Sequence, residues 1–262
     1  MRLSIRGDGP LVIKLAGTAG GTGLYDEEME AAAAAGFRVA ALDTTGDRSD
    51  DPAPAAITWD GLAEDVARGL EALGATRAVL WGTAFGSLVA LAAASRRPES
   101  VSGLLLCRPP EPRGLPRFQT ALIRWAFGRR DPVLATRLLF VAGFNLLAAW
   151  EGIYPTTLVR VPALLRASRE AATPASTVLS KLRLLLEESP GLPPAEARIP
   201  AAILAGAWDT VAPLAGARRL AASIPGARIS VLRFSGHSGA YSRPRAYARL
   251  AVRDLRQLAS AR

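Results

Sequence analysis

Two glycines four positions apart, Gly82 and Gly86, separate a strand-like run from a helix-like run. The pentapeptide that they bound reads Gly-Thr-Ala-Phe-Gly. Residues 77–81 before it are mostly apolar and of strand length, whereas residues 87–94 after it are rich in helix-forming alanine and leucine. A chain can change from strand to helix this quickly only through a sharp turn, and glycine permits the close backbone contacts that such a turn requires. The feature predicts an α/β fold with Ala84 at the apex of a tight turn.

Apolar runs of strand length alternate with helical runs elsewhere in the chain. Helices are expected over residues 26–35 and 59–73, each followed by a glycine that suits a helix end. Strands are expected, together with residues 77–81, at 1–6, 11–16, 37–42, 101–107, 199–206 and 228–234. This alternation predicts a mostly parallel α/β sheet flanked by helices.

Residues 111–195 interrupt the alternation. The segment has no strand signal, proline and glycine punctuate both of its ends, and its interior is helical in composition. We therefore predict three parts: residues 1–110 as the first part of the core, residues 111–195 as an inserted helical cap or lid, and residues 196–262 as the second part of the core. The longest apolar stretch, residues 138–150, is shorter than the roughly 20 residues that span a bilayer, so no membrane span is expected.

The net charge of +9 is concentrated between residues 108 and 183, where twelve basic residues stand against four acidic ones, a net of +8. Arginine dominates, because Lys14 and Lys181 are the only lysines in the chain. We interpret this basic segment as an arginine-rich surface in contact with solvent. A sharper hypothesis is that it steers an anionic or carrier-bound small-molecule substrate. Nucleic-acid binding is not expected from a charge confined to one segment.

Cysteine and histidine each occur once, as Cys107 and His237. No disulfide can form within the chain and no multi-cysteine metal site is possible, so neither a metal nor a cofactor is expected. The glycine-rich residues 17–23 lack the Gly-Lys-Ser/Thr ending of a P-loop, which makes nucleotide binding a weak interpretation. The first six residues alternate like a strand and lack the apolar core of a secretion signal, which favours a cytoplasmic location.

Candidate active-site residues follow the ends of three expected strands. Ala84, Asp209 and His237 each lie within a few residues of such an end. Ligands of open α/β sheets bind beyond the carboxyl ends of the strands, so we expect the three residues at one edge of the sheet.

With these residues in this order, the chain resembles the α/β-hydrolase family, in which a nucleophile, an acid and a histidine follow one another. The likeness extends over nearly the whole chain. It is carried by the glycine loop at 17–23, the Asp-x-x-Gly turn at 43–46, the pentapeptide at 82–86, the Gly-x-x-Asp turn ending at Asp209 and the Gly-His pair ending at His237. The resemblance implies an α/β-hydrolase fold and hydrolysis of an ester or related acyl bond of a largely apolar small molecule.

The resemblance also implies roles for single residues. His237 corresponds to the general base and Asp209 to the carboxylate that orients it. The backbone N–H groups of Phe85 and Thr18 correspond to the two donors of the oxyanion hole. Aromatic residues of the cap are the expected substrate contacts: Trp125, Phe140, Phe144 and Trp150.

Ala84 departs from the family pattern, because a methyl group cannot attack a carbonyl. The residue is either native or a serine that was replaced to stop turnover, and both origins stay open. Thr83 and Ser87 are not at the apex and are not expected to substitute for the nucleophile. If Ala84 is native, a His-Asp pair suits a lyase, cyclase, decarboxylase or cofactor-free oxygenase. A ligand-binding pseudoenzyme is a third interpretation. The substrate and the oligomeric state are not indicated by the sequence.

Overall fold

A computed structural model shows the fold of the chain and describes residues 3–18, 25–48, 56–112, 115–136, 138–139 and 173–260. These residues form a seven-stranded sheet in the order β1-β3-β2-β4-β5-β6-β7. β1 runs antiparallel to β3, and the other neighbouring pairs are parallel. The predicted, mostly parallel sheet is therefore confirmed. Its strands are β1 (Leu3–Arg6), β2 (Leu11–Leu15), β3 (Arg38–Leu42), β4 (Ala78–Thr83), β5 (Val101–Cys107), β6 (Ala201–Gly206) and β7 (Arg228–Leu232).

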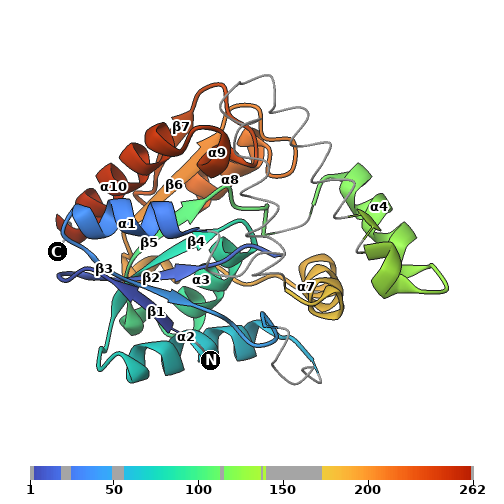
Figure 1. Cartoon of the computed structure of the whole chain (residues 1–262), viewed down its shortest axis with the longest axis horizontal. Helices are drawn as coiled ribbons and strands as arrows, with labels where there is room; N and C mark the ends of the chain where they lie inside the picture. Colours follow the sequence, from blue (N-terminus) through green and yellow to red (C-terminus); the bar gives the residue numbers. More distant parts are fainter. Residues whose placement is uncertain are drawn as a thin grey trace.

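Helices cover both faces of the sheet (Figure 1). One hydrophobic cluster joins the strands to α2 (Trp59–Ala72), α3 (Phe85–Arg96) and α8 (Leu214–Ser223). A second cluster joins the alternate strand residues to α1 (Asp26–Ala34) and α10 (Pro244–Ser260), which the short helix α9 (Gly239–Ser242) precedes. Because successive strand residues point to opposite faces, the two clusters lie on opposite sides of the sheet. Single turns of 3₁₀ helix occur at η2 (Pro98–Ser100) and η3 (Ala195–Ala197).

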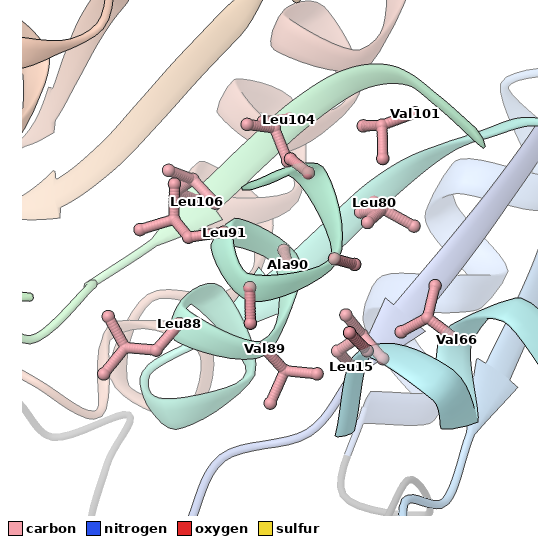
Figure 2. Close-up of a cluster of buried hydrophobic side chains, with 14 of the residues drawn as sticks. Leu15, Val66, Leu80, Leu88, Val89, Ala90, Leu91, Val101, Leu104 and Leu106 are labelled. Carbon is pink, nitrogen blue, oxygen red and sulfur yellow. The ribbon is translucent and has the colours of Figure 1, made fainter. Parts of the chain in front are cut away.

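α3 is the most deeply buried helix of this arrangement. Every residue from Phe85 to Ala94 is buried, as expected for a helix that is apolar on all sides. Figure 2 shows Leu88, Val89 and Leu91 of α3 in one cluster with Leu80 of β4 and with Leu104 and Leu106 of β5. Leu88 and Leu91 have no exposed surface, so replacing either by alanine would cost about 2–5 kcal/mol. The tight packing fixes the N-terminus of α3, which begins at the residue after Ala84.

The described residues between β5 and β6 add no strand to the sheet. They form α4 (Arg117–Phe127) and α7 (Ala175–Glu187), which contact each other through Ile123, Val178 and Leu182. α4 lies well away from the sheet in Figure 1, while α7 lies nearer to it. The boundaries of the cap at residues 111 and 195 stay a prediction. Among the described residues, no helix combines the length and the hydropathy needed to cross a bilayer.

Candidate active site

Ala84 forms the whole turn between strand and helix. β4 ends at Thr83 and α3 begins at Phe85, so a single residue connects the strand to the helix. Its backbone has φ 49° and ψ −115°, a conformation that residues other than glycine rarely adopt. Such strain costs of the order of 1–3 kcal/mol and is found mainly at functional sites. The structure therefore keeps the strained apex although the residue there carries no reactive group.

The two flanking glycines are required by close backbone contacts. A Cβ atom on Gly82 would lie 2.3 Å from the carbonyl oxygen of Gly86. A Cβ atom on Gly86 would lie 2.4 Å from the carbonyl oxygen of Leu15 and 2.5 Å from that of Ala16. All three distances are far below van der Waals contact. The glycine spacing predicted a sharp turn, and the structure adds that this turn packs directly on the end of β2.

Asp209 and His237 are brought together by the loops after β6 and β7. Nδ1 of His237 lies 2.8 Å from Oδ2 of Asp209. The other carboxylate oxygen, Oδ1, accepts hydrogen bonds from the backbone N–H groups of Val211 at 2.9 Å and Ala212 at 2.8 Å. The Asp209 side chain is fully buried, whereas that of His237 is 22% exposed. The carboxylate is therefore fixed, and Nε2 is the ring nitrogen left for proton transfer.

Backbone contacts hold the histidine loop against the end of β6. The N–H of Trp208 donates to the carbonyl of Ser235 at 2.9 Å. A Cβ atom on Gly206 would lie 2.7 Å from the carbonyl oxygens of Ser235 and Gly236, so only glycine fits there. These contacts fix the distance between the two loops that carry Asp209 and His237.

Arg108 contributes to this edge of the sheet, although the sequence indicated it only as a member of the basic segment at residues 108–183. It directly follows β5 and is 4% exposed. Its guanidinium donates to the backbone carbonyl of His237 and lies 5.0 Å from the ring centre of Tyr247. Arg108 thus helps to hold the loop that carries His237. The signal that could have found it is its position after a buried strand, at the edge where the other candidates lie.

The expected oxyanion-hole residues lie on either side of Ala84. Phe85 is the first residue of α3, where backbone N–H groups have no partner within the helix. Its ring stacks on Trp59 at 5.3 Å between centroids. The loop after β2 approaches from the other side, since a Cβ atom on Gly17 would lie 3.7 Å from that of Ala84. Thr18 follows Gly17 and is partly buried.

The neighbouring hydroxyl groups are engaged elsewhere. Ser87 Oγ is fully buried and donates to the carbonyl of Gly82 at 2.9 Å. Thr83 Oγ1 accepts a hydrogen bond from Lys14 Nζ at 2.7 Å, on the face of the sheet that α1 and α10 cover. Neither hydroxyl lies at the apex of the turn, which agrees with the expectation that neither replaces the nucleophile.

Of the four expected aromatic contacts of the cap, Trp125 alone lies among the described residues. Trp125 lies on α4, is 52% exposed, and its ring lies 4.5 Å from the guanidinium carbon of Arg129. Its assignment as a substrate contact stays a prediction. Phe140, Phe144 and Trp150 lie outside the described residues.

Two side chains connect α4 and α7 to the core beside the site. Gln119 of α4 donates from Nε2 to the carbonyls of Thr210 at 2.9 Å and Val211 at 3.0 Å, in the loop that holds Asp209. Lys181 of α7 forms an ion pair with Asp47 at 2.5 Å, and its ammonium lies 5.3 Å from the ring centre of Phe85. α4 and α7 therefore both contact residues next to the candidate site.

The interpretation of the basic segment as a solvated surface is wrong for two of its members. Lys181 and Arg108 are 1% and 4% exposed, respectively. Lys181 is buried because Asp47 neutralises it, and Arg108 because the His237 carbonyl and the ring of Tyr247 receive its guanidinium. Composition alone does not distinguish such partnered cations from exposed ones.

A cavity of about 290 Å³ lies on the outer side of the Asp209 loop, between the start of α4 and α8. Val211, Pro213 and Arg117 are among its lining residues, but Ala84 and His237 are not. We therefore do not assign it to the chemistry of the site. Among the described residues, no group of three or more histidine, cysteine, aspartate or glutamate side chains could hold a metal ion.

Comparisons with known proteins place this chain in a family. The family model described as alpha/beta hydrolase fold matches residues 10–244, so the chain belongs to the α/β-hydrolase family. A relative named carbamate hydrolase RutD, from Klebsiella pneumoniae (strain 342), is 29% identical over 243 residues, which cover 87% of this chain and 85% of the relative.

Solved structures of hydrolases have the same fold. A thermophilic esterase from Thermogutta terrifontis superposes with a TM-score of 0.75 at 21% identity, over 98% of this chain and 93% of the esterase. A meta-cleavage product hydrolase from Pseudomonas fluorescens IP01 was solved as a serine-to-alanine mutant complexed with acetates. It superposes with a TM-score of 0.75 at 21% identity, and the match covers 98% of this chain and 94% of the hydrolase chain. At these identities the likeness shows the fold alone.

Proposed function

We propose that this chain acts on the acyl group of a largely apolar small molecule, as the ester-hydrolysing members of its family do, but without a covalent nucleophile. The observation that carries the proposal is the 2.8 Å contact between His237 and Asp209, combined with a turn that keeps its strained apex at Ala84. The names of the relatives, which include a carbamate hydrolase and an esterase, support hydrolysis as the reaction class.

The remaining groups can perform hydrolysis in one stage. Asp209 holds His237 with its proton on Nδ1, so that Nε2 carries the free electron pair. Nε2 takes a proton from a water molecule while the water oxygen bonds to the carbonyl carbon of the ester. The carbonyl oxygen becomes an oxyanion, which the N–H groups of Phe85 and Thr18 stabilise. The carbon–oxygen bond to the alcohol then breaks, and His237 returns its proton to the departing alkoxide.

The absence of a hydroxyl at Ala84 sets the expected rate. In serine proteases, removing the nucleophile lowers kcat by about 10⁶ and leaves a rate about 10³–10⁴ above that in water. We expect esterase activity of this residual size. No acyl-enzyme can form at Ala84, so alcohol and acid are released together and no burst of alcohol precedes steady turnover.

A second candidate is removal of a proton from the substrate itself. It is favoured by the retention of a positioned base and a strained apex in a chain whose nucleophile position holds a methyl group. In this case His237 deprotonates a carbon or hydroxyl group, and the backbone donors stabilise the enolate or alkoxide that results. Lyase, cyclase, decarboxylase and cofactor-free oxygenase reactions share this step.

Quenched-reaction mass spectrometry with activated esters tests the proposal. We expect slow hydrolysis by the native chain with no covalent adduct, and an adduct of the acyl group on the Ala84→Ser variant. His237→Ala should abolish the activity of both, while Ser223→Ala, which removes a hydroxyl in α8, should change neither. Hydrolysis that persists after His237→Ala would refute a His237 base. Ester binding without conversion in either background would indicate a pseudoenzyme.

A further inference from the structure

Lys14 occupies a position where a charged residue needs an explanation. It lies in the interior of β2, is 0% exposed and is among the largest fully buried side chains of the described structure. Lysine is almost never fully buried unless it is paired, because an ammonium loses its hydration on burial. An apolar residue would fill the same place in the strand at no such cost. The proposed reaction does not use Lys14.

The ammonium of Lys14 is held by groups from three different elements. It donates to Oε2 of Glu28 in α1 at 2.7 Å and to Oγ1 of Thr83 in β4 at 2.7 Å. It also lies over the rings of Trp81, at 4.0 Å, and Tyr25, at 4.5 Å. These contacts satisfy a group that carries three donors and a full charge. Desolvation by burial nevertheless lowers the pKa of Lys14, and the nearby Glu28 carboxylate opposes this effect.

One of these partners, Thr83, belongs to a backbone segment that carries an expected oxyanion donor, and another, Tyr25, is hydrogen-bonded to the other such segment. Thr83 is the last residue of β4 and directly precedes Ala84, and the N–H of Phe85 comes next. Tyr25 accepts a hydrogen bond at Oη from the N–H of Gly17 at 3.1 Å, one residue before Thr18. The same ammonium therefore contacts one group on each side of Ala84.

We propose that Lys14 is a positioning residue, whose ammonium holds the turn through Thr83 and the neighbouring loop through Tyr25. The turn and the loop meet directly, since the added Cβ of Gly17 would lie 3.6 Å from the Thr83 carbonyl oxygen. Their separation sets the distance between the two oxyanion donors, and such donors act well only within a narrow range of distances to the oxyanion. The effect of Lys14 on the reaction rate rests on the proposed function. Its effect on the position of the turn and the loop does not.

The rate test uses an Ala84→Ser background, in which turnover is fast enough to measure. Thr83→Val and Tyr25→Phe each remove one hydroxyl and keep the shape of the side chain. Lys14→Met combined with Glu28→Gln removes the cation without leaving an unpaired carboxylate. We expect each change to lower kcat about tenfold and to alter KM less than twofold, because loss of one complete oxyanion donor costs about 10²–10³ in kcat. Ser223→Ala is the matched hydroxyl deletion outside the network and should leave both parameters unchanged.

Amide hydrogen exchange in the parent chain, which carries Ala84, tests the same inference without any catalysis. The amides of Gly17, Thr18 and Phe85 should exchange at least tenfold faster in Tyr25→Phe and in the paired Lys14 and Glu28 variant, while those of α10 keep their native rates. Unchanged kcat and unchanged exchange in folded Thr83→Val and Tyr25→Phe would overturn the role of Lys14, even if the paired variant fails to fold. If Ala84→Ser shows no esterase activity, the proposed function fails and the exchange measurement still decides on Lys14.

Discussion

Nδ1 of His237 lies 2.8 Å from Oδ2 of Asp209, across 28 positions of sequence. The pairing is possible because parallel strands β6 and β7 end side by side, which places their following loops at one edge of the sheet. Asp209 is further fixed by two backbone N–H groups. The acid and the histidine are thus held in place although the nucleophile position has no functional group.

Asp209→Asn should remove most of the activity of the Ala84→Ser variant. An asparagine amide in this place favours the wrong tautomer of His237, with its proton on Nε2, so that the ring cannot accept a proton there. The same exchange in a serine protease lowers kcat by about 10⁴, and we expect a loss of this order. Steady-state kinetics with an activated ester measures it. Retention of more than a tenth of the kcat would contradict the orienting role of Asp209.

Gly86→Ala should destabilise the fold severely. Its added Cβ would lie 2.4 Å from the carbonyl oxygen of Leu15, and both groups belong to packed backbone. We expect a loss of about 3 kcal/mol or more in the free energy of unfolding, measured by urea denaturation. Gly128→Ala is the control. Its added Cβ would meet nothing closer than 3.7 Å, and its φ of −80° suits alanine. This variant should raise the free energy of unfolding by up to about 1 kcal/mol. Similar effects for both variants would show that the close contact is not what selects glycine.

Lys181→Met should weaken the attachment of α7 to the core. The change leaves the carboxylate of Asp47 buried without its cation, which costs about 3–5 kcal/mol for a pair of this kind. Adding Asp47→Asn should recover most of the loss, because the buried charge is then removed. Arg97→Met breaks the exposed pair with Glu64 and should cost less than about 1 kcal/mol. Equal losses for the buried and the exposed pair, by denaturant unfolding, would argue against this account.

Tyr25 should make the stability of the protein fall at high pH. Burial raises its pKa to about 12 from an ordinary value of 10, with Glu28 and Asp47 adding to the shift and the Gly17 N–H and Arg108 opposing it. Between pH 10 and 12 the unfolded chain loses this proton and the folded chain keeps it, so the free energy of unfolding decreases as the pH rises. A shift of this size corresponds to about 3 kcal/mol.

The difference between the parent chain and Tyr25→Phe isolates this contribution, because every other ionisable group is common to both. Chemical denaturation at pH 9, 10, 11 and 12 should show the parent chain losing its advantage over Tyr25→Phe. A constant difference over this range would mean that Tyr25 ionises as readily in the folded chain as in the unfolded one.

The sequence predicted the parts of the site that depend on local order. The turn at Ala84 follows from glycine spacing between a strand and a helix, and Asp209 and His237 follow from their positions after strands. These relations hold because parallel strands end at a common edge. The roles of Lys14, Arg108 and Lys181 could not be predicted in this way, because their partners are 14 to 134 positions distant and depend on which faces pack together. A lone lysine within an apolar strand gives no indication of the carboxylate that receives it.

The central claim is that the site is complete except for one hydroxyl group at Ala84. The most direct measurement is kcat/KM of Ala84→Ser and of the native chain on a panel of activated esters, with circular dichroism to show that both are folded. The account predicts a gain of several orders of magnitude, up to about 10⁶, for at least one ester. A folded Ala84→Ser variant with no gain on any ester would contradict it and would favour proton abstraction or ligand binding at this site.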